Sequence, residues 1–264
     1  MSADRPRVHG WSADYFFEGK AERRSVQPPF GFPFSFAGLC AIMIPIGVIC
    51  LKRKCANPGT LIPSSSIQEV AENAIQEDCA IEGALFELDV LENIEEKMLD
   101  FVGCVFRKVQ FANMNVQRVH FANCRFEQCD LSGLPFKDGT LNRVEFAGCR
   151  GMGCTFDRMK MKDVLFQDCQ MNYLTLAACR LERVEFSDCD LTHAMFFEST
   201  QKEMTFANCK LIAAEVQFTS LKDVDLSTCE LGGISIQPDS LRGATIQLAQ
   251  SPMILSVFGV KVKL

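Results

Sequence analysis

The sequence is poor in aromatic residues that carry a polar atom and rich in the one that does not. Among its 264 residues there are one Trp and two Tyr, but 22 Phe. Of the three, only Phe brings no polar atom that needs a partner inside a core. The balance indicates a core that selects wholly apolar rings.

Basic residues are also too few to favour direct binding to nucleic acid. The chain carries 27 Lys and Arg against 33 Asp and Glu, and its formal net charge is -6. Residues 1–60 are mildly basic, residues 61–100 are strongly acidic and residues 101–250 are close to neutral. A nucleic-acid-binding domain usually shows a clear basic excess. We therefore expect no direct contact with nucleic acid.

Histidine is scarce, and the sequence shows no catalytic grouping. The three histidines are His9, His120 and His193, and neither of the last two has an in-register Ser, Cys or acid pair that would suggest a triad. Cysteine is plentiful, but pairs such as Cys124 and Cys129 lack the ligand spacing typical of zinc sites. We therefore predict no enzymatic activity, no metal and no cofactor.

The dominant pattern is an apolar residue at every fifth position. The series starts at Phe101, ends at Ile246 and fails at only two of its thirty positions, Gly151 and Gln201. The residue two positions before each of these is small or apolar, with Asp239 as the one charged exception, so two of every five side chains are expected to point inward. A strand alternates with period 2 and a helix repeats every 3.6 residues. A period of five excludes both as the main organisation.

A second period of twenty residues sets the number of sides in each coil. One column of the repeat contains Phe106, Phe126, Phe146, Phe166, Phe186 and Phe206, and another contains Cys129, Cys149, Cys169, Cys189, Cys209 and Cys229. Four sides of five residues therefore close one coil. Coils stacked about 4.8 Å apart would place like residues on like in continuous ladders. The sequence predicts an all-β quadrilateral β-helix over residues 79–250.

The cysteines follow the repeat, which favours core packing over chemistry. Eleven of the fourteen, Cys79 included, fall on the inward small-residue position. Neighbours in a parallel ladder would hold their Cβ atoms about 4.8 Å apart, wider than a disulfide prefers. We therefore expect free thiols, and hence a body that lies in the reducing cytoplasm.

Two stretches, Phe121-Ala-Asn-Cys-Arg and Phe206-Ala-Asn-Cys-Lys, closely resemble the repeat of the pentapeptide-repeat family. The end of the chain, Leu221 to Glu230 and Asp239 to Ala244, resembles the chromosomal Qnr-like (quinolone-resistance-type) members of Gram-positive bacteria. The resemblance implies that the β-helix is right-handed. The best-studied Qnr-like members are acidic dimeric rods that mimic duplex DNA and engage DNA gyrase or topoisomerase IV.

This chain departs from those relatives in two ways. Its register runs from residue 101 to 246 without the projecting loops of the enterobacterial members, and its coil body is nearly neutral. The resemblance therefore implies the fold directly. It implies topoisomerase binding and a homodimer only as expectations.

Residues 1–62 are predicted to form an N-terminal extension outside the repeat. Within it, residues 30–51 carry no charge, are long enough to span a bilayer and are followed by three basic residues, Lys52 to Lys54. Their prolines and glycines make a poor helix, so a membrane anchor and a loosely packed or disordered extension both remain open. A cleaved signal is disfavoured because nearly thirty mostly polar residues precede the segment.

Short capping segments are expected on either side of the repeat. Residues 63–78 are predicted to be a linker followed by a short acidic helix, from Ile67 to Glu77. Residues 251–264 are predicted to form a C-terminal cap.

The outward positions supply the candidate binding residues. One side carries a stripe of carboxylates, in which no base follows Glu127: Glu127, Glu145, Asp168, Glu185, Asp188 and Asp225. We expect these acids to form a ladder of like charges that a basic partner recognises. A different side carries Met195, Phe197 and Phe218, which as outward apolar residues are typical of an interface.

Two functions follow from these surfaces. The first is a non-enzymatic DNA mimic whose acidic stripe binds a type II topoisomerase. The second is a structural or scaffolding module that binds through the side of Met195, Phe197 and Phe218, with a membrane tether at residues 30–51 as an option.

Overall fold

The computed structural model describes residues 53–64, 66–95, 98–114 and 118–263, which belong to one compact unit. The apolar segment 30–51 lies outside the described residues, so its two readings stay predictions. No helix in the described part of the chain is long and apolar enough to cross a membrane.

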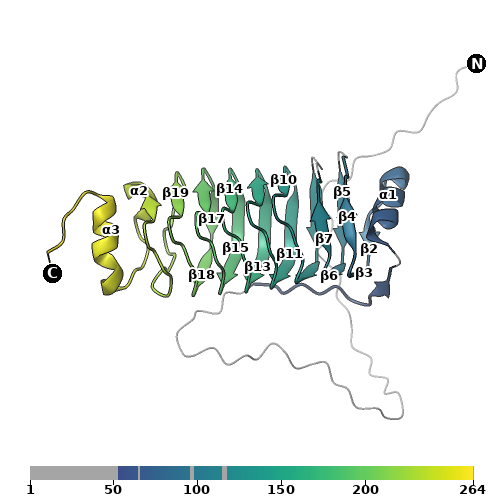
Figure 1. Cartoon of the computed structure of the whole chain (residues 1–264), viewed down its shortest axis with the longest axis horizontal. Helices are drawn as coiled ribbons and strands as arrows, with labels where there is room; N and C mark the ends of the chain where they lie inside the picture. The colour runs from purple at the N-terminus through teal and green to yellow at the C-terminus, as the bar shows by residue number, and fades with distance from the viewer. Residues whose placement is uncertain (1–52, 65, 96–97, 115–117, 264) are drawn as a thin grey trace, which may run out of the picture. The chain divides into compact units, whose positions relative to one another are not determined.

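Short parallel strands make up most of the regular secondary structure of the described chain, with helices at the two ends (Figure 1). The strands are β1 (Ile62–Pro63), β2 (Ile81–Glu82), β3 (Ala84–Glu87), β4 (Val90–Glu92), β5 (Leu99–Val102), β6 (Val105–Arg107), β7 (Gln110–Ala112), β8 (Val119–Ala122), β9 (Arg125–Glu127), β10 (Pro135–Lys137), β11 (Thr140–Ala147), β12 (Thr155–Asp157), β13 (Lys160–Gln167), β14 (Thr175–Ala177), β15 (Arg180–Ser187), β16 (Met195–Phe197), β17 (Thr200–Lys202), β18 (Thr205–Ala207), β19 (Glu215–Gln217) and β20 (Ser235–Ile236). The helices are α1 (Ile67–Glu77), α2 (Pro238–Leu241), the 3-10 turn η1 (Leu248–Gln250) and α3 (Ser251–Val257).

Every strand pairing after β1 joins a residue to the one twenty positions later. Val144 pairs with Val164, and Val164 pairs with Val184. One set of pairings builds a twelve-stranded sheet, and another builds a six-stranded sheet in the order β10-β12-β14-β16-β19-β20. The described chain is therefore a quadrilateral β-helix of about eight turns, as the two periods predict, and it is right-handed, as the resemblance implies.

A residue in the left-handed backbone region ends each five-residue side. Positive φ values recur two positions after the central apolar residue, as at Asn123 (55°), Asp163 (56°) and Asn208 (52°). Asn, Asp and Gly adopt this conformation most readily, because their side chains are short and polar or absent. At these corners the chain turns from one side of the coil to the next without a projecting loop.

The core is a column of phenylalanine rings along the coil axis. Ring centroids lie 4.6 Å apart between Phe106 and Phe126, 4.7 Å between Phe146 and Phe166, and 4.8 Å between Phe166 and Phe186. These distances match the spacing of neighbouring strands, about 4.8 Å. Rings in register can therefore stack without disturbing the backbone ladder.

The two gaps in the five-residue series have separate structural reasons. At Gly151 a Cβ atom would lie 2.4 Å from Sδ of Met171, because the methionine of the next coil fills the space of the missing side chain. Gln201 is only half-buried, and its amide nitrogen donates to the carbonyl oxygens of Ser220 and Lys222. At the first gap a side chain of the neighbouring coil fills the space, and at the second gap hydrogen bonds hold the polar side chain in place.

Two expectations from the register are wrong at the edges of the repeat. Cys79 is exposed, because it lies between the end of α1 and the first coil strand. Asp239, expected to face inward, is exposed, and Ser240 is buried in its place because α2 shifts the register. Residues 62–63, between which the sequence places the boundary of the extension, form β1 and pair with β3.

Helical segments close both ends of the core. At the start, α1 buries Ile67, and the main-chain N–H of Ile67 donates to a carboxylate oxygen of Asp89 at 2.6 Å. At the other end, α3 buries Ile254, and Gln250 donates to the carbonyl oxygens of Leu226 and Cys229. Such caps are required because the last coil of a solenoid has no further neighbour to cover it.

Replacing Phe166 by Ala should test the core directly. The ring is fully buried between Phe146 and Phe186, so its loss should lower the free energy of unfolding by about 3–5 kcal/mol. Phe218→Ala is the control, because the Phe218 side chain is 63% exposed and its loss should cost less than about 1 kcal/mol. Chemical denaturation measures both, and equal losses would contradict the assignment of the core.

Candidate partner-binding surfaces

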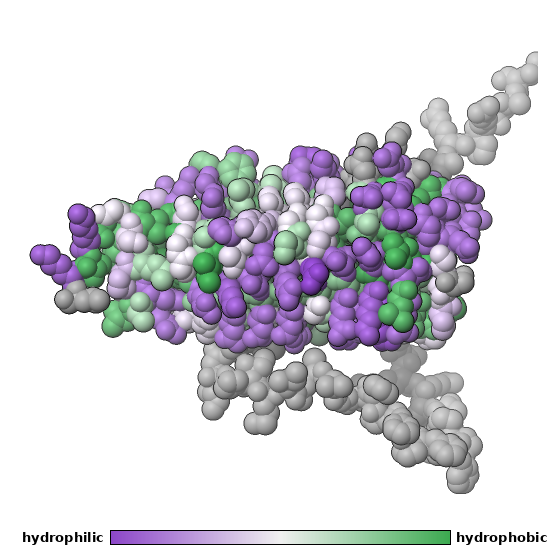
Figure 2. Space-filling view, viewed as in Figure 1, coloured by the Kyte–Doolittle hydropathy of each residue, from purple (hydrophilic) through white to green (hydrophobic). Residues whose placement is uncertain are grey.

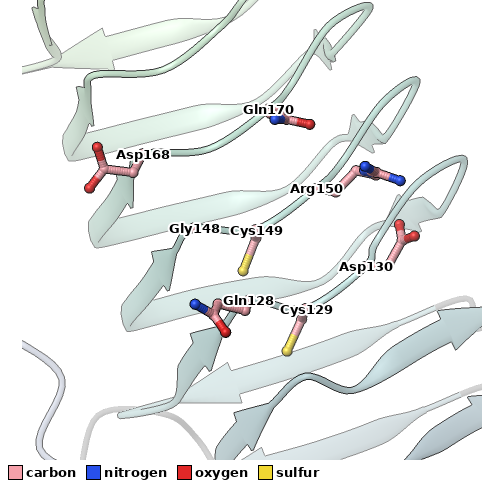
Figure 3. Close-up of a pocket in the computed structure, with 8 residues that line it drawn as sticks. All are labelled: Gln128, Cys129, Asp130, Gly148, Cys149, Arg150, Asp168 and Gln170. Atoms are coloured by element: carbon pink, nitrogen blue, oxygen red, sulfur yellow. The ribbon is translucent and has the colours of Figure 1, made fainter. Parts of the chain in front are cut away.

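The described surface holds no grouping of side chains suited to catalysis. A shallow depression of about 320 Å³ lies across the coils that carry Gln128, Gly148 and Asp168 (Figure 3). Figure 3 shows that its two cysteines, Cys129 and Cys149, turn into the coil, while the polar side chains leave the backbone in different directions. Nothing in this depression converges on a point where a reacting atom could sit.

The cysteine column is part of the core. The thiols of Cys149, Cys169 and Cys189 donate weakly to the carbonyl oxygens of Phe126, Phe146 and Phe166, at 3.5, 3.5 and 3.3 Å. Across the described residues no disulfide forms, and no group of three His, Cys, Asp or Glu side chains is placed to hold a metal ion. A small side chain with a weak donor suits this position, since each thiol faces a carbonyl oxygen of the preceding coil.

Burial makes two core thiols outside this column poor nucleophiles. It raises the pKa of Cys154, and it raises the pKa of Cys179 to about 11. A thiol must ionise to attack or to bind a metal. These two thiols therefore contribute packing, as their inward position in the repeat predicts.

The acidic residues of the predicted stripe do lie on one side of the coils, but they do not form an uninterrupted ladder. Glu145 and Glu185 are two coils apart, because Leu165 occupies the same position between them. Glu127 forms ion pairs with Arg107 at 2.8 Å and Arg125 at 3.2 Å. The side of the coils that carries Glu127, Glu145, Asp168, Glu185, Asp188 and Asp225 is called the acidic side below.

A segment that the sequence assigns to the extension lies along this part of the solenoid. Residues 53–61, called the strap below, run from the coil of Glu185 back to the coil of Gly83, and β1 follows them. A Cβ atom at Gly103 would lie 2.9 Å from the carbonyl oxygen of Pro58, so the strap passes very close to this corner. Nine extended residues reach about 30 Å, which exceeds the five coil steps of about 24 Å that the segment covers.

Arg53 of the strap neutralises part of the acidic side. Its guanidinium lies 3.2 Å from Glu145 and 3.5 Å from Glu185, and the main-chain N–H of Ala56 donates to the same Glu145 oxygen at 3.2 Å. The side chains of Arg53 and Glu145 are only 11% and 13% exposed. The expectation of a purely acidic stripe of mutually repelling charges is therefore wrong, because a base distant in sequence bridges two of its members.

The strap also covers a carboxylate that periodicity places on the outside. Asp163 is buried, and it accepts hydrogen bonds from Arg183 at 2.6 and 3.1 Å and from the main-chain N–H of Lys54 at 3.2 Å. Burial by itself would raise the pKa of Asp163, but these donors stabilise the charged form and lower the pKa overall. Sequence reasoning missed this pair, although the twenty-residue period places Asp163 and Arg183 on successive coils. The cover by the strap has no local signal in the sequence.

The third candidate surface is apolar. Met195 and Phe197 extend from β16, and the ring of Phe197 contacts that of Phe218 edge to face at a centroid distance of 5.8 Å. Phe197 is half-buried, whereas Phe218 and Met195 are exposed. The expected cluster therefore exists, with Phe218 as its most accessible member.

The coil histidines carry no catalytic geometry. His193 stacks on the exposed ring of Tyr173 at 4.9 Å, a pair that the sequence analysis missed although both residues occupy the same position of successive coils. His120 contacts the hydroxyl of Thr140 through Nδ1 at 2.7 Å. Elsewhere the face seen in Figure 2 is mostly hydrophilic, with apolar residues scattered among polar ones.

The fold and its surfaces define a class, a parallel β-solenoid that presents its sides outward. The family model of the pentapeptide repeat region matches residues 99–176, 119–196 and 140–218, within the part of the chain where the five-residue sides were found. The chain is a pentapeptide-repeat protein. No curated protein matches it.

Several solved structures are similar to this chain over about two thirds of its length. A trypsin-treated variant of QnrB1, a plasmid-mediated fluoroquinolone resistance protein, is 19% identical, covers 68% of this chain and 90% of its own, and has a TM-score of 0.36. HetL, a pentapeptide repeat protein involved in heterocyst differentiation regulation in the cyanobacterium Nostoc sp. strain PCC 7120, is 11% identical, covers 69% and 95%, and has a TM-score of 0.28. At these values the likeness carries no argument about function.

Thiol labelling should distinguish the buried core thiols from an exposed cysteine. In the native protein Cys79 should react with a thiol reagent at pH 8, while Cys154 and Cys179 should stay unmodified because their thiols are buried and un-ionised. Mass spectrometry of the labelled protein locates each adduct, and labelling in denaturant is the control. Rapid native labelling of Cys154 would contradict the core assignment.

Asp163→Asn should weaken the fold and remove part of its acid sensitivity. A carboxylate whose pKa is lowered by folding stabilises the protein above its unfolded pKa of about 3.9, and the contribution is lost as the pH falls through the lower folded value. The substitution should lower the free energy of unfolding at pH 7 by about 1–3 kcal/mol. The difference from wild type should shrink towards pH 2. Asp138→Asn, which alters the exposed pair with Arg158, is the matched control and should change neither value measurably.

Proposed function

We propose that this chain is a non-enzymatic, protein-binding pentapeptide-repeat rod whose acidic side is its main binding surface. The observation that carries the proposal is the docking of Arg53 between Glu145 and Glu185. That contact is an example, within the chain itself, of the acidic side receiving a guanidinium group. A protein that offers basic side chains at similar spacing would meet the same carboxylates.

The more specific form of the proposal is a DNA mimic that acts on a type II topoisomerase, DNA gyrase or topoisomerase IV. From Glu127 to Asp225 the acidic side covers five coil steps, about 24 Å, and carries six carboxylates. One strand of duplex DNA carries about seven phosphates over that length. The charge density of one side thus approaches that of a single DNA strand, which supports binding in a basic groove built for phosphates.

The charge balance also sets a limit on this mimicry. Arg107, Arg125 and Arg53 pair with acids on the same side, so its net charge is well below that of the strand it would replace. Asp168 and Asp188 are the most accessible pair, since both are exposed and lie at the corners of adjacent coils. We assign the first contacts with a basic partner to this pair.

A supercoiling assay with purified gyrase tests the proposal. The wild-type chain should inhibit supercoiling or alter quinolone poisoning, and Asp168→Asn combined with Asp188→Asn should weaken the effect about tenfold, since charge pairs at a binding surface govern association. Both positions adopt positive φ, which Asn tolerates, so the variant should fold normally.

The matched control is Glu198→Gln combined with Glu230→Gln, which removes two exposed carboxylates away from the acidic side. It should behave as wild type in the supercoiling assay. No effect of the wild-type chain on gyrase or topoisomerase IV would remove the topoisomerase proposal. An equal loss in both double variants would show that net charge, and not the acidic side, governs binding.

A scaffolding function is the second candidate, and the contact between Phe197 and Phe218 favours it. Phe218 is 63% exposed, and a large exposed aromatic ring next to Met195 is typical of an interface. In affinity capture, Phe218→Ala with Met195→Ala should lose any partner bound on this side while leaving partners of the acidic side bound. The reverse pattern would exclude the apolar side.

A further inference from the structure

The strap is the only part of the described chain that crosses several coils along the axis, and polar groups hold it there. Arg53 forms two ion pairs with the acidic side, the main-chain N–H of Ala56 donates to Glu145, and that of Lys54 donates to the neighbouring Asp163. None of its residues is buried. The strap therefore rests on the solenoid without entering its core.

A segment with no buried residue opens more readily than the coils. Its ion pair between Arg53 and Glu145 is largely covered, at 11% and 13% side-chain exposure, so opening requires that water or another base reach the carboxylate, while the more exposed pair with Glu185 weakens as salt increases. Segments with few buried apolar contacts take part in local opening at free energies far below that of global unfolding. The coils beneath the strap, in contrast, are held by the register that joins each residue to the one twenty positions later.

When Arg53 leaves, Glu185 loses its ion pair and Glu145 keeps only the longer pair with Arg125, at 3.9 Å. The side chains of Glu145 and Glu185 are 13% and 29% exposed with Arg53 in place. A partly buried carboxylate without its cation is unfavourable, so the site either opens to water or takes another base. The group best suited to take the place of the Arg53 side chain is another guanidinium, because it donates several hydrogen bonds in a fixed plane.

We propose that the strap is an internal occupant of the acidic side, and that an extended, arginine-bearing segment of a partner protein binds this side by displacing the strap. Arg53 thereby competes with the partner for Glu145 and Glu185. The affinity of the acidic side for a basic partner is therefore lowered by a segment of the chain itself. The inference rests on the proposed function, since it concerns the same side of the coils.

The test uses the full-length chain and octa-arginine as the probe, at low salt. Arg53→Ala should tighten binding of octa-arginine about threefold, because one competing ion pair is removed. Arg158→Ala is the matched control: it removes the same charge from an arginine paired with Asp138 and Asp157 on another part of the surface. It should leave the affinity near the wild-type value.

A second pair of substitutions locates the effect. In the Arg53→Ala background, Glu145→Gln with Glu185→Gln should abolish the gain in affinity. Equal effects of Arg53→Ala and Arg158→Ala, or a gain that survives the two Gln substitutions, would overturn the inference.

Hydrogen exchange provides a readout that does not depend on the probe. In the wild-type chain residues 53–61 should exchange faster than the coil strands, and in Arg53→Ala they should exchange faster still while the coils stay protected. Unchanged coils also show that the variant folds. Wild-type strap amides as protected as those of β13 and β15 would contradict a displaceable strap.

The same variants separate this inference from the proposed function. In one result, Arg53→Ala binds octa-arginine more tightly while neither chain affects gyrase or topoisomerase IV. That result would support displacement of the strap and exclude a type II topoisomerase as the partner. In the opposite result, the wild-type chain and Arg53→Ala inhibit the topoisomerase equally, and Arg53→Ala binds octa-arginine no more tightly. That result would support the proposed function and exclude the strap as a competitor.

Discussion

The rest of the structure depends on the parallel register that joins each residue to the one twenty positions later. Each five-residue side has only two inward side chains, and its backbone groups find partners on neighbouring coils. No coil can bury its apolar residues or pair its backbone alone, so stability comes from stacking. The phenylalanine column meets this constraint because stacked rings prefer nearly the same spacing as paired strands.

This constraint leaves most outward side chains free of structural demands. The corners need residues that tolerate positive φ, but the positions between them accept acids, bases or aromatic rings. A surface of this kind can present charge or apolar area at a regular spacing along its axis. Binding function in such a fold is consequently a property of its sides, and the solenoid serves to hold those sides in register.

The strap changes what one of those sides presents. Arg53, Lys54 and Ala56 bring a guanidinium and two main-chain donors to carboxylates that are 89 or more residues away in sequence. Because the strap is polar and unburied, its position responds to salt, to acid and to competing bases in a way that the coils do not. The acidic side thus combines a rigid ladder of strands with a cover of much lower stability.

The sequence by itself determined the coil, the core columns and the inward position of the thiols, because a period of five repeated over twenty allows only one arrangement of stacked sides. It also placed Phe218 and the stripe acids outward. Only the tertiary structure decided that Asp163 is buried, that Arg53 pairs with Glu145, and that Asp239 turns outward at α2. These features depend on contacts between segments distant in sequence or on the loss of the period, and a periodic pattern carries no information about either.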